Sequence, residues 1–198
     1  GYTDQQLVQI VFGPGFAALY FNNAGASQVK GLETETNWQM TKSLRLYSIL
    51  AFNGGKYTKP LFCSNQLGAR INCTDKHLKG LPAVDSTLGL RFSPEISVLP
   101  GQLLFNVEWD HTSEMYNDTA NPLPPPLNFG PTPLLNLYNA SVRWTGPKAE
   151  WYALLQVTNL TNKHYVQAGY TNSNPINPGV VGYLGEPRVE WFRIGYSF

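Results

Sequence analysis

Within the carboxy-terminal eleven residues, 188–198, apolar and polar side chains alternate from Phe192 to Phe198. In an extended chain the two sets fall on opposite sides, as Phe192, Ile194, Tyr196 and Phe198 against Arg193, Gly195 and Ser197. A period of two is typical of a strand with one apolar and one polar surface. A strand of about ten residues, tilted by about 45°, is long enough to cross a bilayer. The pattern therefore predicts a membrane-crossing strand.

The same alternation recurs along the chain in segments that glycine and proline separate. Reading between these residues predicts about eight strands: roughly 3–12, a long extended stretch 16–40, 44–57, 83–93, 102–116, 135–145, 151–158 and 188–198. Six prolines in 119–133 exclude a helix or an interior strand there, because proline lacks the N–H that either structure needs. That segment is predicted to be a loop.

The connections between these segments alternate in length. They are short at 40–43, 94–101 and 146–149, and long at 58–82, 118–133 and 161–187. Bacterial outer-membrane barrels have short periplasmic turns and long extracellular loops, with apolar residues outside and polar residues in the lumen. The sequence therefore predicts an all-β, antiparallel transmembrane β-barrel fold with three long loops on the outside.

A soluble antiparallel sandwich is the rival fold, because its strands also alternate and its apolar face forms a core. Strand lengths of about ten or more favour the barrel, since strands in soluble proteins usually have five or six residues. Trp38, Trp144 and Trp151 lie beside short turns and Tyr196 lies near the same end. This grouping is typical of an interfacial aromatic girdle.

Composition narrows the class further. Charged residues make up 14% of the 198 residues and the net charge is +1, so no electrostatic footprint for nucleic acid is present. The longest apolar run, 16–21, is too short for a membrane helix, so a membrane crossing would need strands. The sequence starts at Gly1 without an initiator methionine or signal peptide, and we expect a mature product or a piece of a larger chain.

Cys63 and Cys73 are the only cysteines, and they flank a loop between two strand-like segments. In an oxidising compartment a disulfide here would contribute about 3 kcal/mol in the chain-entropy model. Free thiols are the alternative. No further ligands have metal-site spacing, so neither a metal nor a cofactor is predicted.

Four segments resemble elements of TonB-dependent outer-membrane receptors. They are Asn22-Asn-Ala-Gly-Ala-Ser-Gln-Val-Lys-Gly-Leu-Glu-Thr-Glu35, Leu81-Pro-Ala-Val-Asp85, Asn159-Leu-Thr-Asn-Lys-His-Tyr165 and Gly185-Glu-Pro-Arg188. Leu32 replaces the usual valine of the first, and Asp85 replaces the second proline of the next. Phe198 matches the terminal aromatic residue that the barrel-assembly machinery recognises in this family.

The resemblance implies that residues 1–198 form a carboxy-terminal segment of a 22-stranded barrel, supplying about eight of its strands. The plug domain and the TonB-contacting box of such receptors have no counterpart in the sequence. The resemblance further implies active uptake of a scarce nutrient, most commonly a ferric siderophore, in the bacterial outer membrane. Partners would be outer-membrane lipid, a small nutrient ligand, the assembly machinery, and TonB through the missing plug.

Eight charged residues are predicted to face the lumen by the alternation argument: Glu33, Glu35, Arg45, Asp85, Arg91, Glu108, Arg143 and Arg193. A charge that is buried there needs a partner. The family implies pairing with the plug or with lumen water, and pairing across neighbouring strands is the alternative. Glu108, Asp110 and His111 form either a ligand contact or a solvated lumen face.

Six aromatic residues in or beside the long loops are candidate ligand contacts: Tyr57, Phe62, Tyr116, Phe129, Tyr170 and Tyr183. Loop packing is the alternative role. His164 and Tyr165 belong to a family motif and are expected to shape a turn. The common nucleophile, phosphate-binding and zinc-protease motifs do not occur, so the sequence does not predict an enzyme.

We therefore predict part of a TonB-dependent nutrient receptor barrel. Two other classes stay open: a self-contained small outer-membrane barrel with a porin-like or structural role, and a secreted sandwich that binds carbohydrate through exposed aromatic residues.

Overall fold

The structure is a computed structural model, in which residues 6–13, 16–23, 25–64, 70–117, 131–172 and 179–197 are described. Its regular elements there are all strands: β1 (Gln6–Gly13), β2 (Phe16–Asn23), β3 (Ser27–Gln39), β4 (Leu44–Tyr57), β5 (Phe62–Ser64), β6 (Arg70–Asn72), β7 (Val84–Phe92), β8 (Gln102–Thr112), β9 (Leu135–Thr145), β10 (Trp151–Thr158), β11 (Val166–Asn172), β12 (Gly179–Leu184) and β13 (Val189–Tyr196). No helix in this part of the chain is long and apolar enough to span a membrane.

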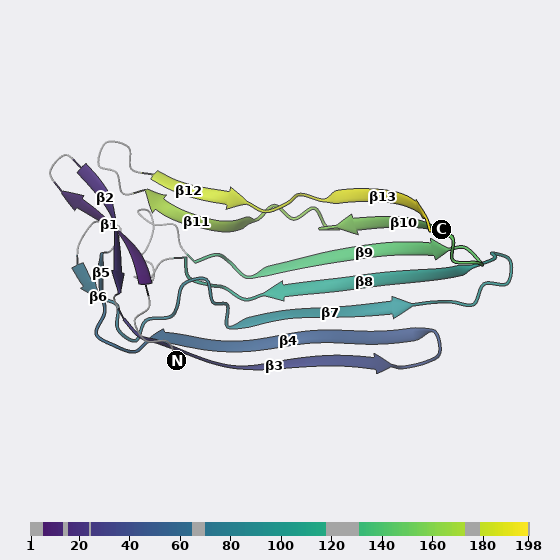
Figure 1. Cartoon of the computed structure of the whole chain (residues 1–198), viewed down its shortest axis with the longest axis horizontal. Coiled ribbons are helices and arrows are strands. Elements are labelled where there is room, and N and C mark those ends of the chain that lie inside the picture. The colour runs from purple at the N-terminus through teal and green to yellow at the C-terminus, as the bar shows by residue number, and fades with distance from the viewer. Residues whose placement is uncertain are drawn as a thin grey trace.

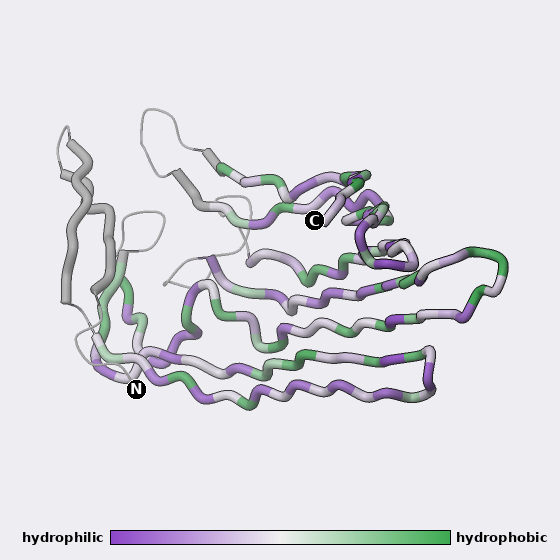
Figure 2. The backbone as a smooth tube through the Cα atoms, turned by 45° about the vertical axis from the view of Figure 1, so that its right-hand side comes forward, coloured by the Kyte–Doolittle hydropathy of each residue, from purple (hydrophilic) through white to green (hydrophobic). Residues whose placement is uncertain are grey.

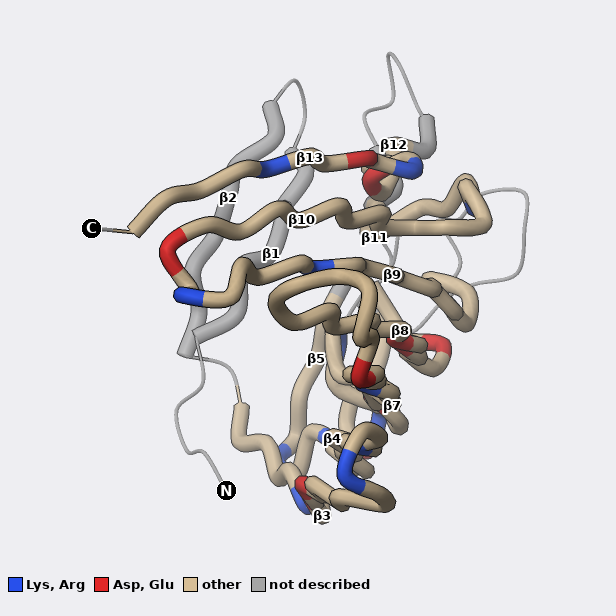
Figure 3. Tube along the Cα trace, turned by 90° about the vertical axis from the view of Figure 1, so that its right-hand side faces the viewer, with Lys and Arg blue, Asp and Glu red and all other residues tan. Residues whose placement is uncertain are grey.

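Seven of these strands form one antiparallel sheet in the order β13-β10-β9-β8-β7-β4-β3 (Figure 1). The strands of this sheet lie side by side in the order in which they occur along the chain, so the sheet is a meander. Viewed from the end with the short turns, the strands change direction from β3 to β13, as expected for a twisted sheet (Figure 3). Within the described residues, the outer edges of β3 and β13 have no partner strand.

The two ends of the sheet differ in their connections. The short turns after β3, β7 and β9 lie at one end, where the chain also terminates (Figure 1). The described parts of the long connections after β4, β8 and β10 lie at the other end, and the connections after β4 and β10 contain the small hairpins β5–β6 and β11–β12. The predicted all-β antiparallel class and the predicted alternation of short turns and long loops are both confirmed.

Apolar and polar residues alternate along much of each strand of the sheet (Figure 2). Because successive side chains of a strand point to opposite sides, this alternation gives the sheet two chemically different faces. The register between strands is continuous, so side chains that share a row also share a face. For example, Leu46 pairs with Leu90 on the apolar face, and Arg45 pairs with Arg91 on the polar face. We refer to these two surfaces as the apolar face and the polar face.

The predicted strand boundaries agree with the structure for β4, β9 and β10 and differ at other places. The predicted stretch 16–40 is two strands, because the chain breaks at Gly25, whose φ of 150° suits glycine, and at the buried residue Ala26. β2 then pairs with β1 in a separate hairpin, so the main sheet contains seven strands and not eight. The predicted strand 102–116 ends at Thr112.

The hydrophobic core of the described residues does not lie beneath the sheet. It consists of Tyr57, Leu61, Cys63, Cys73 and Leu78, with Ile71 and Leu81 packed against it. We call these residues the loop cluster, because all but Tyr57 belong to the connection between β4 and β7. A sandwich requires a second sheet packed on the apolar face, and the described part of the chain contains none there.

Candidate functional site

The polar face of the sheet carries all eight charged residues that the sequence predicted to point into a lumen. The cross-strand register places Arg45 opposite Arg91, Glu108 opposite Gly89, and Arg143 in the same row as Leu104 and Leu154. The same register places the other four on the polar face: Glu33, Glu35, Asp85 and Arg193.

Several of these charges lie toward opposite ends of the strands. Arg45 is the second residue of β4, Arg91 is the penultimate residue of β7, and Arg143 is two residues from the end of β9. All three therefore lie near the short turns. Asp85 and Asp110 lie toward the long loops, at the other ends of β7 and β8. Within the described residues, none of the eight predicted charges forms an ion pair with another.

Tyr47 is the centre of the contacts between β4 and β8. Its hydroxyl donates to the carboxylate of Glu108 at 2.6 Å and contacts Asn106 Oδ1 at 3.1 Å. The guanidinium carbon of Arg91 lies 4.6 Å from the centre of the Tyr47 ring, in cation–π geometry. The ring covers Gly89 on β7, where a Cβ atom would collide with it. Glycine at position 89 therefore allows the tyrosine to cross the neighbouring strand.

Asn139 extends this arrangement to β9. Its side-chain amide donates to Asp110 Oδ2 at 2.7 Å and to Glu108 Oε1 at 3.5 Å. The other oxygen of Asp110 accepts a hydrogen bond of 2.6 Å from the hydroxyl of Thr87. We call the connected side chains the polar network: Tyr47, Thr87, Asn106, Glu108, Asp110 and Asn139. Its two carboxylates are held by neutral hydroxyl and amide donors.

A second tyrosine repeats the geometry of Tyr47. The ring of Tyr152 covers Gly195 on β13, again where a Cβ atom would collide, and Arg143 lies 4.4 Å from the ring centre. Two of the predicted lumen arginines therefore stack on tyrosines, which holds each guanidinium close to the wall. Sequence reasoning missed these tyrosine–glycine pairs, although Tyr47 and Tyr152 share the parity of the charged residues.

Asn159 joins the polar network to the loops. Its backbone N–H donates to Asn139 Oδ1 at 3.0 Å, and its own amide donates to the carbonyls of Lys163 and Glu186 at 2.9 and 3.0 Å. The side chain is almost fully buried and φ is 49°, a left-handed conformation that asparagine tolerates. The ring of Tyr165 lies over Gly185, which follows β12. The segments 159–165 and 185–188, noted in the sequence, thus form one hydrogen-bonded junction.

The candidate ligand contacts in the loops have different fates. Tyr57 is 1% exposed in the loop cluster, so its interpretation as a ligand contact is corrected: the leucines and the disulfide that surround it leave no free surface. Phe62 and Tyr183 are exposed, at 48% and 58%. Phe129 and Phe198, and the side chain of Tyr170, lie outside the described residues.

Tyr116 connects two of the long loops. Its ring stacks on His77, with centroids 5.4 Å apart and planes 18° apart, and its carbonyl accepts a 2.8 Å hydrogen bond from the N–H of Gly80. Nothing local in the sequence indicates this contact between Tyr116 and His77. Within the described residues, no three His, Cys, Asp or Glu side chains gather in a way that would hold a metal ion.

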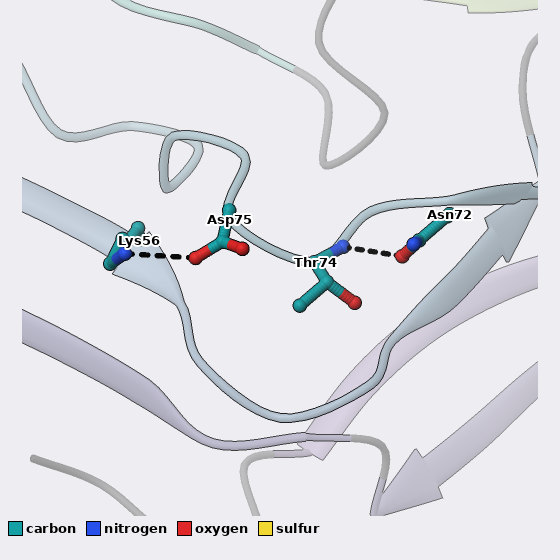
Figure 4. Close-up of polar contacts among 4 residues, drawn as sticks. All are labelled: Lys56, Asn72, Thr74 and Asp75. Carbon is teal, nitrogen blue, oxygen red and sulfur yellow. Dashed lines mark hydrogen bonds and ion pairs between the residues drawn. The ribbon is translucent and has the colours of Figure 1, made fainter.

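Cys63 and Cys73 are joined by a disulfide, with their Cα atoms 6.0 Å apart. Backbone hydrogen bonds from Cys73 N to Leu61 O and from Asp75 N to Tyr57 O tie the bridged segment to the end of β4. The adjacent turn is held by Thr74 N, which donates to Asn72 Oδ1 at 2.9 Å (Figure 4). The loop cluster is therefore an ordered structure at the long-loop end of the sheet.

The apolar face has aromatic residues near its margins. Trp151 and Tyr196 pack with ring centres 4.6 Å apart at the short-turn end, and Trp38 is 55% exposed near the same end. At the long-loop end, Trp109 lies opposite Tyr138. Exposed apolar residues between two aromatic margins, over a polar inner face, define the wall of a transmembrane β-barrel of the outer-membrane class.

Comparison with solved structures gives the fold more closely. The chain is similar to the ferric yersiniabactin uptake receptor FyuA from Yersinia pestis, with a TM-score of 0.71 and 15% identity over 90% of this chain and 25% of that one. For the siderophore receptor PiuA from Acinetobacter baumannii, the TM-score is 0.66 and the identity 20%, over 89% of this chain and 22% of that one.

The ferric citrate transporter FecA, in its unliganded form, gives a TM-score of 0.66 and 20% identity over 88% of this chain and 25% of that one. The chain has the fold of part of the barrel of TonB-dependent receptors, and it spans about a quarter of the length of these three proteins. No protein-family model matches the chain, and no curated protein matches it in sequence.

Proposed function

We propose that this chain forms part of the wall of an outer-membrane receptor that takes up a scarce nutrient, with a ferric siderophore or a similar iron complex as cargo and TonB as the source of energy. The observation that carries the proposal is the seven-stranded meander with one apolar face, one polar face and all short turns at one end. The similarity in fold to FyuA, PiuA and FecA supports this assignment.

The proposal gives each face a role. The apolar face contacts lipid, the short turns lie in the periplasm and the long loops lie outside the cell. The polar network faces the lumen, where Glu108 and Asp110 are available to cargo or to a plug domain because their present hydrogen-bond donors are neutral. Phe62, Tyr116 and Tyr183 are the loop aromatic residues proposed to contact the nutrient.

The self-contained small barrel is the competing function. In the described residues the edges of β3 and β13 do not pair with each other, which favours a wall completed by further strands. In a bilayer an open edge would leave backbone N–H and C=O groups without partners, at a cost of several kcal/mol for each group. On our proposal β13 therefore pairs with another strand of the barrel, and Phe198 acts as its assembly signal.

Labelling of single cysteines in whole cells tests the orientation. Lys148→Cys places a thiol in the short turn after β9, and Lys79→Cys places one in the long connection after β4. The native cysteines form a disulfide and will not react. A membrane-impermeant maleimide should label Lys79→Cys in intact cells, and Lys148→Cys only after the outer membrane is permeabilised. Labelling in the reverse order would refute the orientation.

Growth under iron limitation tests the transport. Cells that lack the intact protein should fail to grow on one or more ferric siderophores supplied as the sole iron source, and cells that lack TonB should show the same defect. Restoring the wild-type protein should restore growth only when TonB is present. Uptake that is unaffected by loss of TonB would favour a passive small barrel and would contradict the proposal.

A further inference from the structure

Charge on the polar face is sorted by row, where a row is the set of side chains that the register places opposite one another across the strands. The carboxylates of this face occupy three adjacent rows on the long-loop side: Glu33, Glu35, Asp85, Glu108 and Asp110. The arginines occupy the next two rows on the short-turn side: Arg45, Arg91, Arg143 and Arg193. Within the described strands of the sheet, the two sets do not mix on this face. We call them the carboxylate rows and the arginine belt.

The arginine belt follows the direction of the aromatic margin. Its two members on β9 and β13 lie one row nearer the short turns than its two members on β4 and β7, a step of about 7 Å. The margin shifts in the same direction: Trp38 on β3 shares a row with Val157 on β10, whereas Trp151 lies six residues nearer the short turns. Strands of outer-membrane barrels are tilted, so a line parallel to the membrane crosses the rows obliquely. The four arginines therefore lie at a similar depth, near the short-turn margin.

The guanidinium groups of the belt are held in place with donors to spare. All four side chains are exposed. The ring of Tyr47 covers one face of Arg91, and stacking of this kind leaves the N–H edge of the guanidinium available. Tyr152 does the same for Arg143. Arg45 uses only Nε, in a hydrogen bond of 2.8 Å to a neighbouring glutamine. Planar donor edges of this kind suit the bidentate binding of an oxyanion.

The belt lacks a counter-charge in the described part of the chain. No described carboxylate forms an ion pair with any of the four arginines. Arg45 lies directly opposite Arg91, and like charges in such a pair destabilise neighbouring strands. Glu108 is one row away, and its carboxylate accepts the hydroxyl of Tyr47 instead. An anion bound between the two arginines would remove their repulsion.

The order of the signs matters for a ligand that moves through the lumen. Adjacent rows of one face are about 7 Å apart, and the Debye length at physiological ionic strength is about 8 Å, so the change of sign is not screened out. An anion is repelled by the carboxylate rows and attracted by the arginine belt. Its energy therefore falls toward the short turns, and the carboxylate rows oppose its return. A resident partner could neutralise both sets of charges, but only a moving ligand uses their order.

We propose that the arginine belt binds the acidic groups of an anionic iron complex as it leaves the lumen, so that the cargo belongs to the complexes with carboxylate or catecholate groups and a net negative charge. This inference rests on the proposed function and deepens it by naming the charge of the substrate. It also assigns a second contact site, at the opposite end of the wall from the loop aromatic residues.

A panel of ferric complexes tests the charge of the cargo. Cells that carry the intact receptor are grown under iron limitation on ferric citrate or a ferric tris-catecholate as anions, a ferric trihydroxamate as a neutral complex, or an amine-bearing trihydroxamate as a cation. Receptor-dependent growth should occur on an anionic complex and not on the neutral or cationic ones. Equal growth on a neutral or cationic complex would refute this inference alone, whereas receptor-dependent growth on none would refute the proposed function.

Substitutions in the belt test the site. A unit charge about 4 Å away in water changes a binding constant roughly fivefold, so Arg91→Gln combined with Arg143→Gln should slow uptake of the anionic complex roughly 30-fold. Binding of the complex to cells that lack TonB should not change, because the loops make the first contact. Arg91→Lys combined with Arg143→Lys keeps the charge and should restore most of the uptake. Lys42→Gln combined with Lys148→Gln is the matched control, since it removes the same charge from the short turns.

The remaining outcomes separate the cargo from other partners of the belt. Normal uptake by the Arg91→Gln and Arg143→Gln variant would overturn the inference, as would equal slowing by the short-turn control. Loss of surface binding together with uptake, or a plug domain that becomes sensitive to protease, would assign the arginines to the plug and also overturn it. Heat-modifiable migration of each variant reports folding.

Discussion

Leu32, Val107 and Phe192 on the apolar face of the sheet are more than half exposed, whereas Tyr57 and Leu61 in the loop cluster are 1% exposed. The two regions adjoin at the end of β4. The loop cluster buries its own apolar side chains and adds a disulfide, as a small soluble protein does. Among the described residues, the sheet has hydrogen-bonded strands and no hydrophobic core of its own. On our proposal, lipid covers its apolar face.

On the proposed function, the loop cluster and the sheet are stabilised in two different environments, water and lipid. The loop cluster is stabilised by the removal of apolar surface from water. The strands of the sheet satisfy their backbone groups with one another and leave side chains for lipid to cover, which is the requirement for crossing a bilayer. Substitutions in the two regions should therefore have separable effects, and the predictions below proceed from the largest effect to the smallest.

The largest effect is expected in the loop cluster. Tyr57→Ala removes a buried aromatic side chain and should destabilise the cluster by about 3–5 kcal/mol. Limited proteolysis of the 58–82 connection should become much faster, while the heat-modifiable migration of the barrel should be retained. Phe62→Ala is the control, because Phe62 is half exposed and its loss should leave proteolysis almost unchanged. If Tyr57→Ala also abolished barrel migration, the two regions would not be independent.

A charge on the apolar face should have the next largest effect. Val107 lies in the middle of β8, opposite Leu90 and Ala140. Val107→Arg should destabilise the lipid-embedded barrel by about 2–4 kcal/mol, as cationic residues do near the bilayer midplane. The measurement is the denaturant midpoint of refolding into lipid vesicles. Gln156→Arg on the polar face of β10 is the matched variant, and an equal loss from both would argue against the assignment of the faces.

The smallest effect is expected in the polar network. Tyr47→Phe removes the hydroxyl that donates to Glu108 but keeps the ring over Gly89. Hydrogen bonds to charged groups contribute about 1.5–3 kcal/mol, and lumen water will replace part of this one, so we expect a loss near the lower limit. The same vesicle assay measures it. Tyr47→Ala should cost more because it also uncovers Gly89, and equal losses would assign no role to the ring.

The strands of the wall were predictable because their constraint is local. On β4 and β9 one face meets an apolar environment and the other a polar one, so the period of two is preserved over 14 and 11 residues and their boundaries follow from it. Ile49 and Trp191 are exceptions, since the register places both on the polar face. A wide polar surface tolerates scattered apolar residues, and the pattern alone does not identify them.

The loops were less predictable because their contacts are not local. Tyr57 was interpreted as a ligand contact because it is an aromatic residue beside a long loop. Its burial depends on Leu61, Leu78 and the disulfide, which fold back from later positions. The strands β5, β6, β11 and β12 were missed for a related reason: they are short segments inside regions dominated by turn residues. In the polar network, the parity of the residues was predictable and their hydrogen-bond partners were not.

The junction at Asn159 has a mechanical consequence. Its backbone is anchored to Asn139 on β9, and its side chain holds the carbonyls of Lys163 and Glu186 on the two arms that lead to β11 and from β12. A force on the β11–β12 hairpin would therefore be transmitted through the hydrogen bonds of Asn159 to β9. Because Asn139 also holds Asp110, the load path from the hairpin ends in the polar network.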